Sequence, residues 1–414
     1  MIMSFARRTS MPPPFIGVLL LPSGMNQGFI GVALGYILAQ HGVEVSVIAG
    51  LISLRLLPDT WSFLSGPLVD CTLSSARWYV LSVIALAIGL ELLAFVPLDA
   101  AGTALMAPLC LALGVASIVS NSATSAALAL TTTHAVRGAC AGWRQAGYLG
   151  GIGLGGGVGL WLSTHGPGPG VAAALLGLAS ASCAWPFLVV QVPRVPRGAT
   201  IVSAAREAFG SLWSLLRSRD GVLAVVAVTL PAGLGAAMNL MPAVAGDWGA
   251  SATLVATVTG ILGGLATLPG CIAAGYLCDR FPRRTVFMYS ALLCAAGEAV
   301  MAMCPHSPQN FALFVLVNSA LTGLAYGSVA AVIFDRLGPL GAATVGGVLS
   351  SMCNLPVVVV TVLVGAVQSH RGSNAMLLVE AGLGIASVAL YALLTWAWRP
   401  KAALQTRAQA VGVA

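Results

Sequence analysis

Charged side chains are scarce in this chain. Only 7% of its 414 residues are Asp, Glu, Lys or Arg, whereas a soluble globular domain carries about 25%. With 58% hydrophobic residues and a mean hydropathy of +0.94, the chain cannot cover a water-exposed surface with polar groups. The composition therefore excludes a soluble enzyme, a soluble nucleic-acid-binding protein and a disordered chain, and it predicts a polytopic membrane protein.

Motifs for metal, nucleotide and hydrolytic chemistry are also missing. The nine cysteines are scattered without a CxxC pair, so we expect neither a disulfide framework nor a metal site. No Walker motif is present, which excludes ATP as the direct energy source. Because HExxH and GxSxG are absent as well, we expect no catalytic residues and no cofactor.

Apolar stretches long enough to cross a bilayer recur along the sequence, since a spanning helix needs about 20 such residues. Twelve are predicted: 14–40, 44–65, 78–96, 103–130, 141–163, 170–190, 221–244, 252–276, 285–303, 309–334, 342–367 and 374–398. The predicted fold class is an all-α membrane protein with 12 transmembrane helices.

The basic residues give this map a direction. Of the 19 basic residues, 17 fall on one side, while Arg371 falls on the other and Arg55 lies inside a span. The positive-inside rule then places both termini in the cytoplasm of a bacterial-type inner membrane. The net charge of +7 is thus a topology signal, and we expect the lipid bilayer rather than a nucleic acid as partner.

The longest and most basic loop divides the chain into two halves with a weak repeat. Gly66-Pro-Leu-Val-Asp70 recurs as Gly275-Tyr-Leu-Cys-Asp279, and Glu91 recurs as Glu298. The predicted units are a six-helix bundle over 1–192, a cytoplasmic linker over 193–220, a second bundle over 221–398 and a cytoplasmic tail over 399–414. Duplicated halves of this kind are typical of alternating-access carriers.

Two segments carry a resemblance to known families. The run GYLCDRFPRR at 275–284 resembles the cytoplasmic-loop motif of the major facilitator superfamily. The resemblance implies two pseudo-symmetric six-helix bundles and a monomer, and it implies a gating latch, with Cys71 standing where the first copy of the motif has an arginine. The implied latch residues are Asp70, Asp279, Arg280, Arg283 and Arg284.

The second segment, LPDTWSFLSGPLVD at 57–70, is similar to a run in the AmpG-like branch (peptide/acetyl-CoA/drug transporters). That branch contains muropeptide permeases and siderophore permeases of the RhtX/FptX type. Residues 120–125 read SNSATS where the muropeptide permeases carry acids. The resemblance therefore implies proton-coupled import of a ferric siderophore of the pyochelin or rhizobactin kind. Muropeptide uptake and drug or metabolite export stay open, as does a membrane scaffold or intramembrane enzyme.

Arg55 and Asp59 are the strongest candidate site residues. They lie four residues apart inside a predicted span, so they share a helix face. Unpaired charges are costly in hydrocarbon, so both are expected to face the bundle interior and each other. Two interpretations remain open: a site for an anionic cargo group or proton coupling, and a structural ion pair.

Further polar residues inside spans are predicted to line a central cavity, with interhelical hydrogen bonding as the alternative. They are Asn26, Gln27, Asn121, Gln145, Asn318 and Tyr326. Glu91, Glu298 and Glu380 lie toward the outer ends of their spans, where we expect them to reach the membrane interface. A protonatable role in transport is the alternative for these glutamates.

Four glycines form a predicted helix-packing ridge. Gly147, Gly151, Gly155 and Gly159 recur every fourth residue, which permits close backbone approach. We expect this ridge to face the glycines at 260, 263 and 264 across the boundary between the halves.

Overall fold

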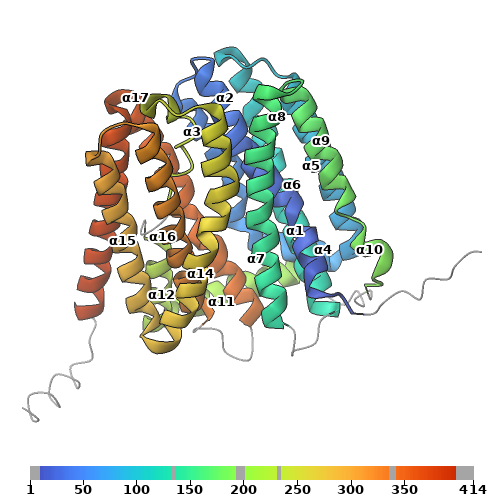
Figure 1. The fold of residues 1–414 in the computed structure, drawn as a ribbon. Helices are drawn as coiled ribbons and strands as arrows, with labels where there is room; N and C mark the ends of the chain where they lie inside the picture. Colours follow the sequence, from blue (N-terminus) through green and yellow to red (C-terminus); the bar gives the residue numbers. More distant parts are fainter. Residues whose placement is uncertain (1–9, 132–136, 193–200, 231–234, 335–341, 398–414) are drawn as a thin grey trace, which may run out of the picture.

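The computed structural model describes residues 10–131, 137–192, 201–230, 235–334 and 342–397, and its regular elements are helices packed side by side (Figure 1). The first half contains α1 (Pro13–Gly28), η1 (Phe29–Leu34), α2 (Gly35–Gln40), α3 (Val45–Leu56), η2 (Leu57–Leu64), α4 (Ser65–Cys71), α5 (Ser75–Phe95), α6 (Ala100–Thr131), α7 (Arg137–Gly153), η4 (Leu154–Val158), α8 (Gly159–His165), α9 (Pro169–Ser182) and α10 (Pro186–Val189).

The second half follows α11 (Ile201–Arg217) and contains α12 (Arg219–Thr229), η5 (Ala245–Trp248), α13 (Ala252–Val255), η6 (Ala256–Leu262), α14 (Gly263–Arg280), α15 (Arg283–Met303), α16 (Pro308–Phe334) and α17 (Ala342–Ala397). Within α17, Gly372 has φ +79°. Glycine adopts this left-handed conformation without steric cost. We call the part of α17 before Gly372 its first limb and the part after it its second limb.

The predicted fold class, an all-α membrane protein, is confirmed. Within the described residues, nine helical stretches are long and apolar enough to cross a membrane, and the last of them, Ser351–Ala397, contains both limbs of α17. The predicted spans 141–163 and 221–244 are not among these nine. The first is nevertheless helical, from α7 through η4 to α8.

Two segments differ from the sequence prediction. The span predicted over 221–244 is not one continuous helix, because α12 ends at Thr229 and residues 236–244 form turns. The linker predicted as a loop over 193–220 contains α11, which packs against α12, α17 and α4. An amphipathic sequence explains this helix, since Val202, Phe209 and Trp213 recur among polar residues.

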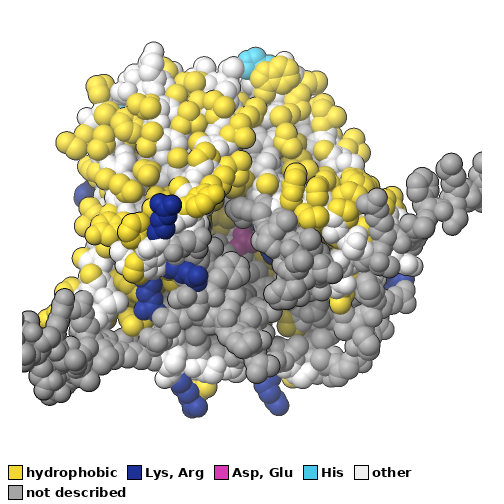
Figure 2. Space-filling view, turned by 60° about the horizontal axis from the view of Figure 1, so that its bottom comes forward, with side chains coloured by type: hydrophobic (Ala, Val, Ile, Leu, Met, Phe, Trp, Pro, Cys, Tyr) yellow, Lys and Arg dark blue, Asp and Glu magenta, His cyan; other side chains and the backbone are white. Residues whose placement is uncertain are grey.

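The two ends of the bundle differ in charge. Arg77, Arg206, Arg217 and Arg280 are exposed at the end where α1 begins and α17 ends. Figure 2, with this end turned forward, shows dark blue Lys and Arg side chains there. We call it the arginine-rich end, and we call the opposite end, where the chain reverses at residues 41–44, 166–168 and 304–307, the far end.

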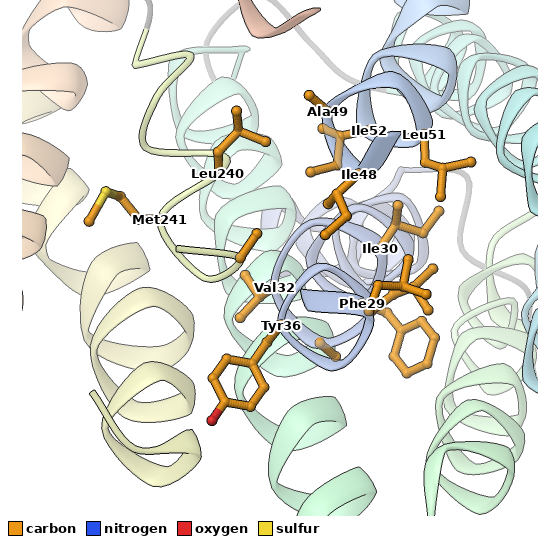
Figure 3. Packing of buried hydrophobic residues seen from close by; sticks show 14 of the residues in the cluster. Phe29, Ile30, Val32, Tyr36, Ile48, Ala49, Leu51, Ile52, Leu240 and Met241 are labelled. Carbon is orange, nitrogen blue, oxygen red and sulfur yellow. The ribbon is translucent and has the colours of Figure 1, made fainter. Parts of the chain in front are cut away.

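At the far end one hydrophobic core joins both halves. It contains Phe29 and Ile48 from the first half and Leu240, Phe311 and Val364 from the second. Figure 3 shows Leu240 and Met241 beside the side chains of η1 and α3. Toward the arginine-rich end the cores are separate: one cluster draws only on the first half and two only on the second. The halves are thus packed together more completely at the far end.

Polar contacts between the halves follow the line where α3 and η2 meet the first limb of α17. The Ser46 backbone N–H donates to Ser369 Oγ at 3.0 Å, and Ser53 Oγ donates to the Val358 carbonyl at 3.2 Å. Nearer the arginine-rich end, the Ser62 and Ser351 hydroxyls are 2.8 Å apart. This seam therefore continues past the middle of the bundle.

On the opposite side of the molecule, the α7–η4–α8 rod meets the α13–η6–α14 rod. A side chain on Gly260 would lie 2.5 Å from Gly157 Cα, and a side chain on Gly264 would lie 3.3 Å from the Leu149 carbonyl oxygen. Figure 1 shows α7 and α14 spreading apart toward the arginine-rich end. The two rods therefore touch closely toward the far end and diverge toward the arginine-rich end.

The glycine ridge of α7, η4 and α8 packs on a different neighbour from the one predicted. A side chain on Gly151 would lie 2.5 Å from the Leu21 carbonyl oxygen of α1, and Gly147 and Gly155 also press on the α1 backbone. Gly159 faces Phe29. The predicted contact with α14 is therefore wrong. The contact across the halves is made by Gly153 and Gly157, which lie on another face of the same rod.

Replacing Gly151 with Leu should destabilise the protein, because the new side chain would be forced into the α1 backbone. Overpacking of this kind costs about 1–3 kcal/mol. Gly150→Leu is the matched control, since the neighbouring position is exposed and a Cβ there meets nothing within 4 Å. Thermal unfolding of the two purified variants in detergent should show a lower Tm for Gly151→Leu, and equal Tm values would contradict the assigned packing.

Candidate functional site

A break in the second apolar span positions the first candidate group. Pro58 cannot donate a backbone hydrogen bond, and α3 gives way there to the 3₁₀ segment η2, within which Trp61 has non-helical angles (φ −121°, ψ 21°). Gly114 of α6 lies against Arg55 and Pro58, and a side chain on Gly114 would lie 2.9 Å from Pro58 Cγ. The glycine therefore lets α6 approach the break closely.

Arg55 is the centre of a buried hydrogen-bond network, with 2% of its surface exposed. Its Nη1 donates to Asp59 Oδ2 at 3.1 Å, and this contact is an ion pair. Its Nε donates to Asn26 Oδ1 at 3.2 Å, and its Nη2 donates to Ser117 Oγ at 3.1 Å. Nη2 also approaches the Ser23 carbonyl oxygen at 3.5 Å. The guanidinium thus ties α3 and η2 to α1 and α6.

The hydrogen bonds of Arg55 determine which member of the Arg55–Asp59 pair a ligand can reach. The Arg55 donors point at partners within the first half, whereas 18% of the Asp59 side chain is exposed. Guanidinium and carboxylate neutralise each other, which removes most of the cost of placing either in an apolar interior. The group offered to a ligand is therefore a carboxylate oxygen beside a neutralising arginine, rather than a free cation for an anion.

Two tyrosines, one from each half, lie within range of each other's charge. The Tyr148 hydroxyl of α7 donates to Gln27 Oε1 of α1, and Tyr148 is close enough to Asp59 for their charges to interact. Tyr326 of α16 is in turn close enough to Tyr148 to interact with it, and 41% of its side chain is exposed. The structure therefore groups Asn26, Gln27, Arg55 and Asp59 in the first half, with Tyr326 opposite them in the second.

The remaining predicted residues lie elsewhere. Asn121 is half-buried, and its Oδ1 has no partner within the described part of the chain. Asn318 is buried against α15, with its Nδ2 3.9 Å from Met301 Sδ. Arg280 is exposed, and Arg283 and Arg284 are half-buried near the start of α15. The side chains of Gln145, Asp70 and Asp279 lie outside the described part, so the latch stays a prediction.

Two buried glutamates were not anticipated. Glu298 and Glu380 are 3% and 5% exposed, so neither reaches the membrane interface as predicted. Glu380 Oε1 accepts from the Ala236 N–H at 2.7 Å, and its Oε2 accepts from the Ala237 N–H. The sequence carried a signal for this contact. The run 230–235 reads LPAGLG, and such a Pro/Gly interruption frees backbone N–H groups that a carboxylate can bind.

Comparison with known proteins agrees with the fold. The sequence matches the Major Facilitator Superfamily over residues 16–361 and, in an overlapping match, over residues 223–412. The chain belongs to this superfamily, and it is a transporter rather than an enzyme. No curated protein sequence matches the chain significantly.

Solved transporters share the fold at low sequence identity. The nucleoside transporter NupG is 13% identical with a TM-score of 0.68, over 92% of this chain and 98% of that one. The xylose transporter XylE from E. coli, in a partially occluded inward-open conformation, is 15% identical with a TM-score of 0.67, over 93% and 97%. A POT family transporter in complex with a peptide is 9% identical with a TM-score of 0.72, over 92% and 95%.

The Arg55–Asp59 pair should show strong energetic coupling. Arg55→Met leaves a buried carboxylate without its partner and should cost about 3–5 kcal/mol of unfolding free energy. Arg55→Met combined with Asp59→Asn should be less destabilised than Arg55→Met alone, because no isolated charge remains. Arg77→Met, at an exposed arginine, should change stability by less than about 0.5 kcal/mol. A denaturant-unfolding double-mutant cycle measures this, and equal losses for Arg55→Met and Arg77→Met would refute the pairing.

Proposed function

We propose that the chain is an inner-membrane secondary carrier that imports an amphiphilic organic solute by alternating access, driven by protons. The preferred cargo is a ferric siderophore of the pyochelin kind, on the resemblance of residues 57–70 to siderophore permeases. Both termini lie in the cytoplasm on this proposal, because the arginine-rich end then obeys the positive-inside rule.

The arrangement of the hydrophobic cores carries this proposal. One core joins the halves at the far end, and separate cores fill them at the arginine-rich end. If the arginine-rich end is cytoplasmic, this is a carrier closed to the outside, whose halves diverge toward the cytoplasm between α7 and α14 while the seam between η2 and α17 stays in contact. In Figure 2 an acidic side chain is visible on the face turned forward.

The groups between the halves suit a cargo with aromatic and polar parts. Tyr148 and Tyr326 offer ring faces and hydroxyls, and Asp59 and Gln27 offer oxygen acceptors. Such a surface binds an amphiphilic molecule through aromatic contact and a few oriented hydrogen bonds. Because Arg55 is already paired, an anionic chelate would bind here through its donors and rings rather than through a free arginine.

Transport into proteoliposomes tests the cargo. Radioiron-labelled ferric pyochelin should accumulate under an inward proton gradient, and Tyr326→Ala should reduce uptake up to about tenfold, since aromatic contacts contribute about 0.5–1.5 kcal/mol. Tyr289→Ala is the control, because Tyr289 is 65% exposed on α15. In parallel assays, unlabelled muropeptides, nucleosides, xylose or peptides are added, and their effect on uptake of labelled ferric pyochelin is measured. Competition by one of these, with no uptake of ferric pyochelin, would reassign the cargo.

A further inference from the structure

The two buried glutamates lie on antiparallel helices that pack against each other. Gly384, in the second limb of α17, faces α15, and a side chain on it would lie 3.3 Å from Ala295 Cβ. One helical turn from this contact, Glu298 follows Ala295 on α15 and Glu380 precedes Gly384 on α17. Antiparallel helices bring these two positions together, and the charges of the two carboxyl groups interact.

The hydrogen bonds to Glu380 suit an ionised carboxylate. Both of its oxygens bind backbone N–H groups, from Ala236 and Ala237, in the segment that follows the break after α12. N–H donors at the start of a turn have no partner within their own segment. Two such donors on one carboxylate form charge-assisted bonds that favour the ionised state.

Glu298 differs from Glu380, because none of the described residues donates a hydrogen bond to its carboxyl group. Its side chain is only 3% exposed. Asn318 Oδ1, which presses on the neighbouring Gly297, is also buried and has no donor there. The Glu298 carboxyl group thus lies near the Glu380 carboxylate, with no donor from the described residues. A proton on Glu298 supplies the missing donor.

Among the described residues, no arginine or lysine interacts with Glu298 or Glu380 to balance a second negative charge. Cys294 on α15 and Tyr326 on α16 face the pair, and beyond Tyr326 lie Cys353 and Tyr148. These four groups are uncharged in their protonated forms. The residues of the break, 231–234, carry no charge in the sequence.

The nearest arginines of the second half lie at helix ends. At a rise of 1.5 Å per residue, Arg284 lies about 21 Å along α15 from Glu298, and Arg371 lies about 13 Å along α17 from Glu380. Two adjacent carboxylates in an apolar interior cannot both be ionised without such a partner. The pair therefore binds one proton as a unit.

We propose that Glu298 and Glu380 form the proton-binding site that drives transport, with Glu380 ionised against the Ala236 and Ala237 amides and Glu298 carrying the exchangeable proton. This rests on the proposed proton-coupled import. The Glu298 carboxylate takes up one proton to become the carboxylic acid, and losing that proton leaves two facing negative charges. Deprotonation therefore destabilises the packing of α15 on the second limb of α17.

This site connects to the proposed cargo region through Tyr326. Tyr326 lies within range of the charge of Glu380 and of Tyr148, and Tyr148 lies within range of the charge of Asp59. A cargo that contacts Tyr326 would thus sit between the ion pair of the first half and the acid pair of the second. Binding of cargo and binding of the proton would be coupled through this one side chain.

Infrared spectroscopy of the purified protein without cargo tests the site itself. The wild-type protein should show the C=O band of a protonated carboxylic acid at neutral pH. Glu298→Gln should abolish this band, whereas Glu91→Gln, at the repeat-related and half-buried position of the first half, should leave it unchanged. Absence of the band in the wild type, or its persistence in Glu298→Gln, would overturn the proposal. Tm values confirm that each variant is folded.

Transport tests the coupling. An inward gradient of about one pH unit drives up to about tenfold accumulation of ferric pyochelin for each coupled proton. Glu298→Gln, which mimics the protonated acid, should abolish this accumulation while retaining exchange of internal for external cargo. Accumulation equal to wild type would refute the coupling role. If wild-type protein transports no ferric pyochelin, the proposed cargo fails, whereas the proton site is still decided by the infrared band.

Discussion

An apolar interior does not tolerate an unneutralised charge, and this constraint organises both halves of the molecule. In the first half, Arg55 and Asp59 neutralise each other, and the remaining guanidinium donors recruit Asn26 and Ser117 from neighbouring helices. In the second half, Glu380 has no arginine and takes backbone N–H donors instead. The same physical requirement is thus met by a side-chain cation on one side and by an interrupted helix on the other.

Both solutions depend on a break in a helix. Pro58 lies where α3 gives way to the 3₁₀ segment η2, and α12 ends at Thr229, before the turns that contain Ala236 and Ala237. Irregular backbone inside a membrane is tolerated where it is buried in protein or lines a cavity. At the first break, Gly114 lets α6 approach Pro58 closely enough to enclose it.

The sequence predicted the features that follow from composition and local spacing. Scarce charge and long apolar runs predicted the all-α membrane fold, and the four-residue spacing predicted that Arg55 and Asp59 meet. It did not predict which helix the glycine ridge touches, because the ridge looks the same whether its partner is α1 or α14. Glu298 and Glu380 were assigned to the interface because linear position alone does not show that α15 and α17 enclose them. Their packing depends on contacts between residues about 80 positions apart.

Accessibility of the space between the halves tests the central claim most directly. Tyr326→Cys places a thiol between the halves, at a position where the native side chain is 41% exposed. The variant is made in a background whose native cysteines are replaced, and it is treated with a membrane-impermeant thiol reagent in inside-out and right-side-out vesicles without cargo. We expect labelling of Tyr326→Cys from the cytoplasmic side. Labelling only from the outer side would contradict it.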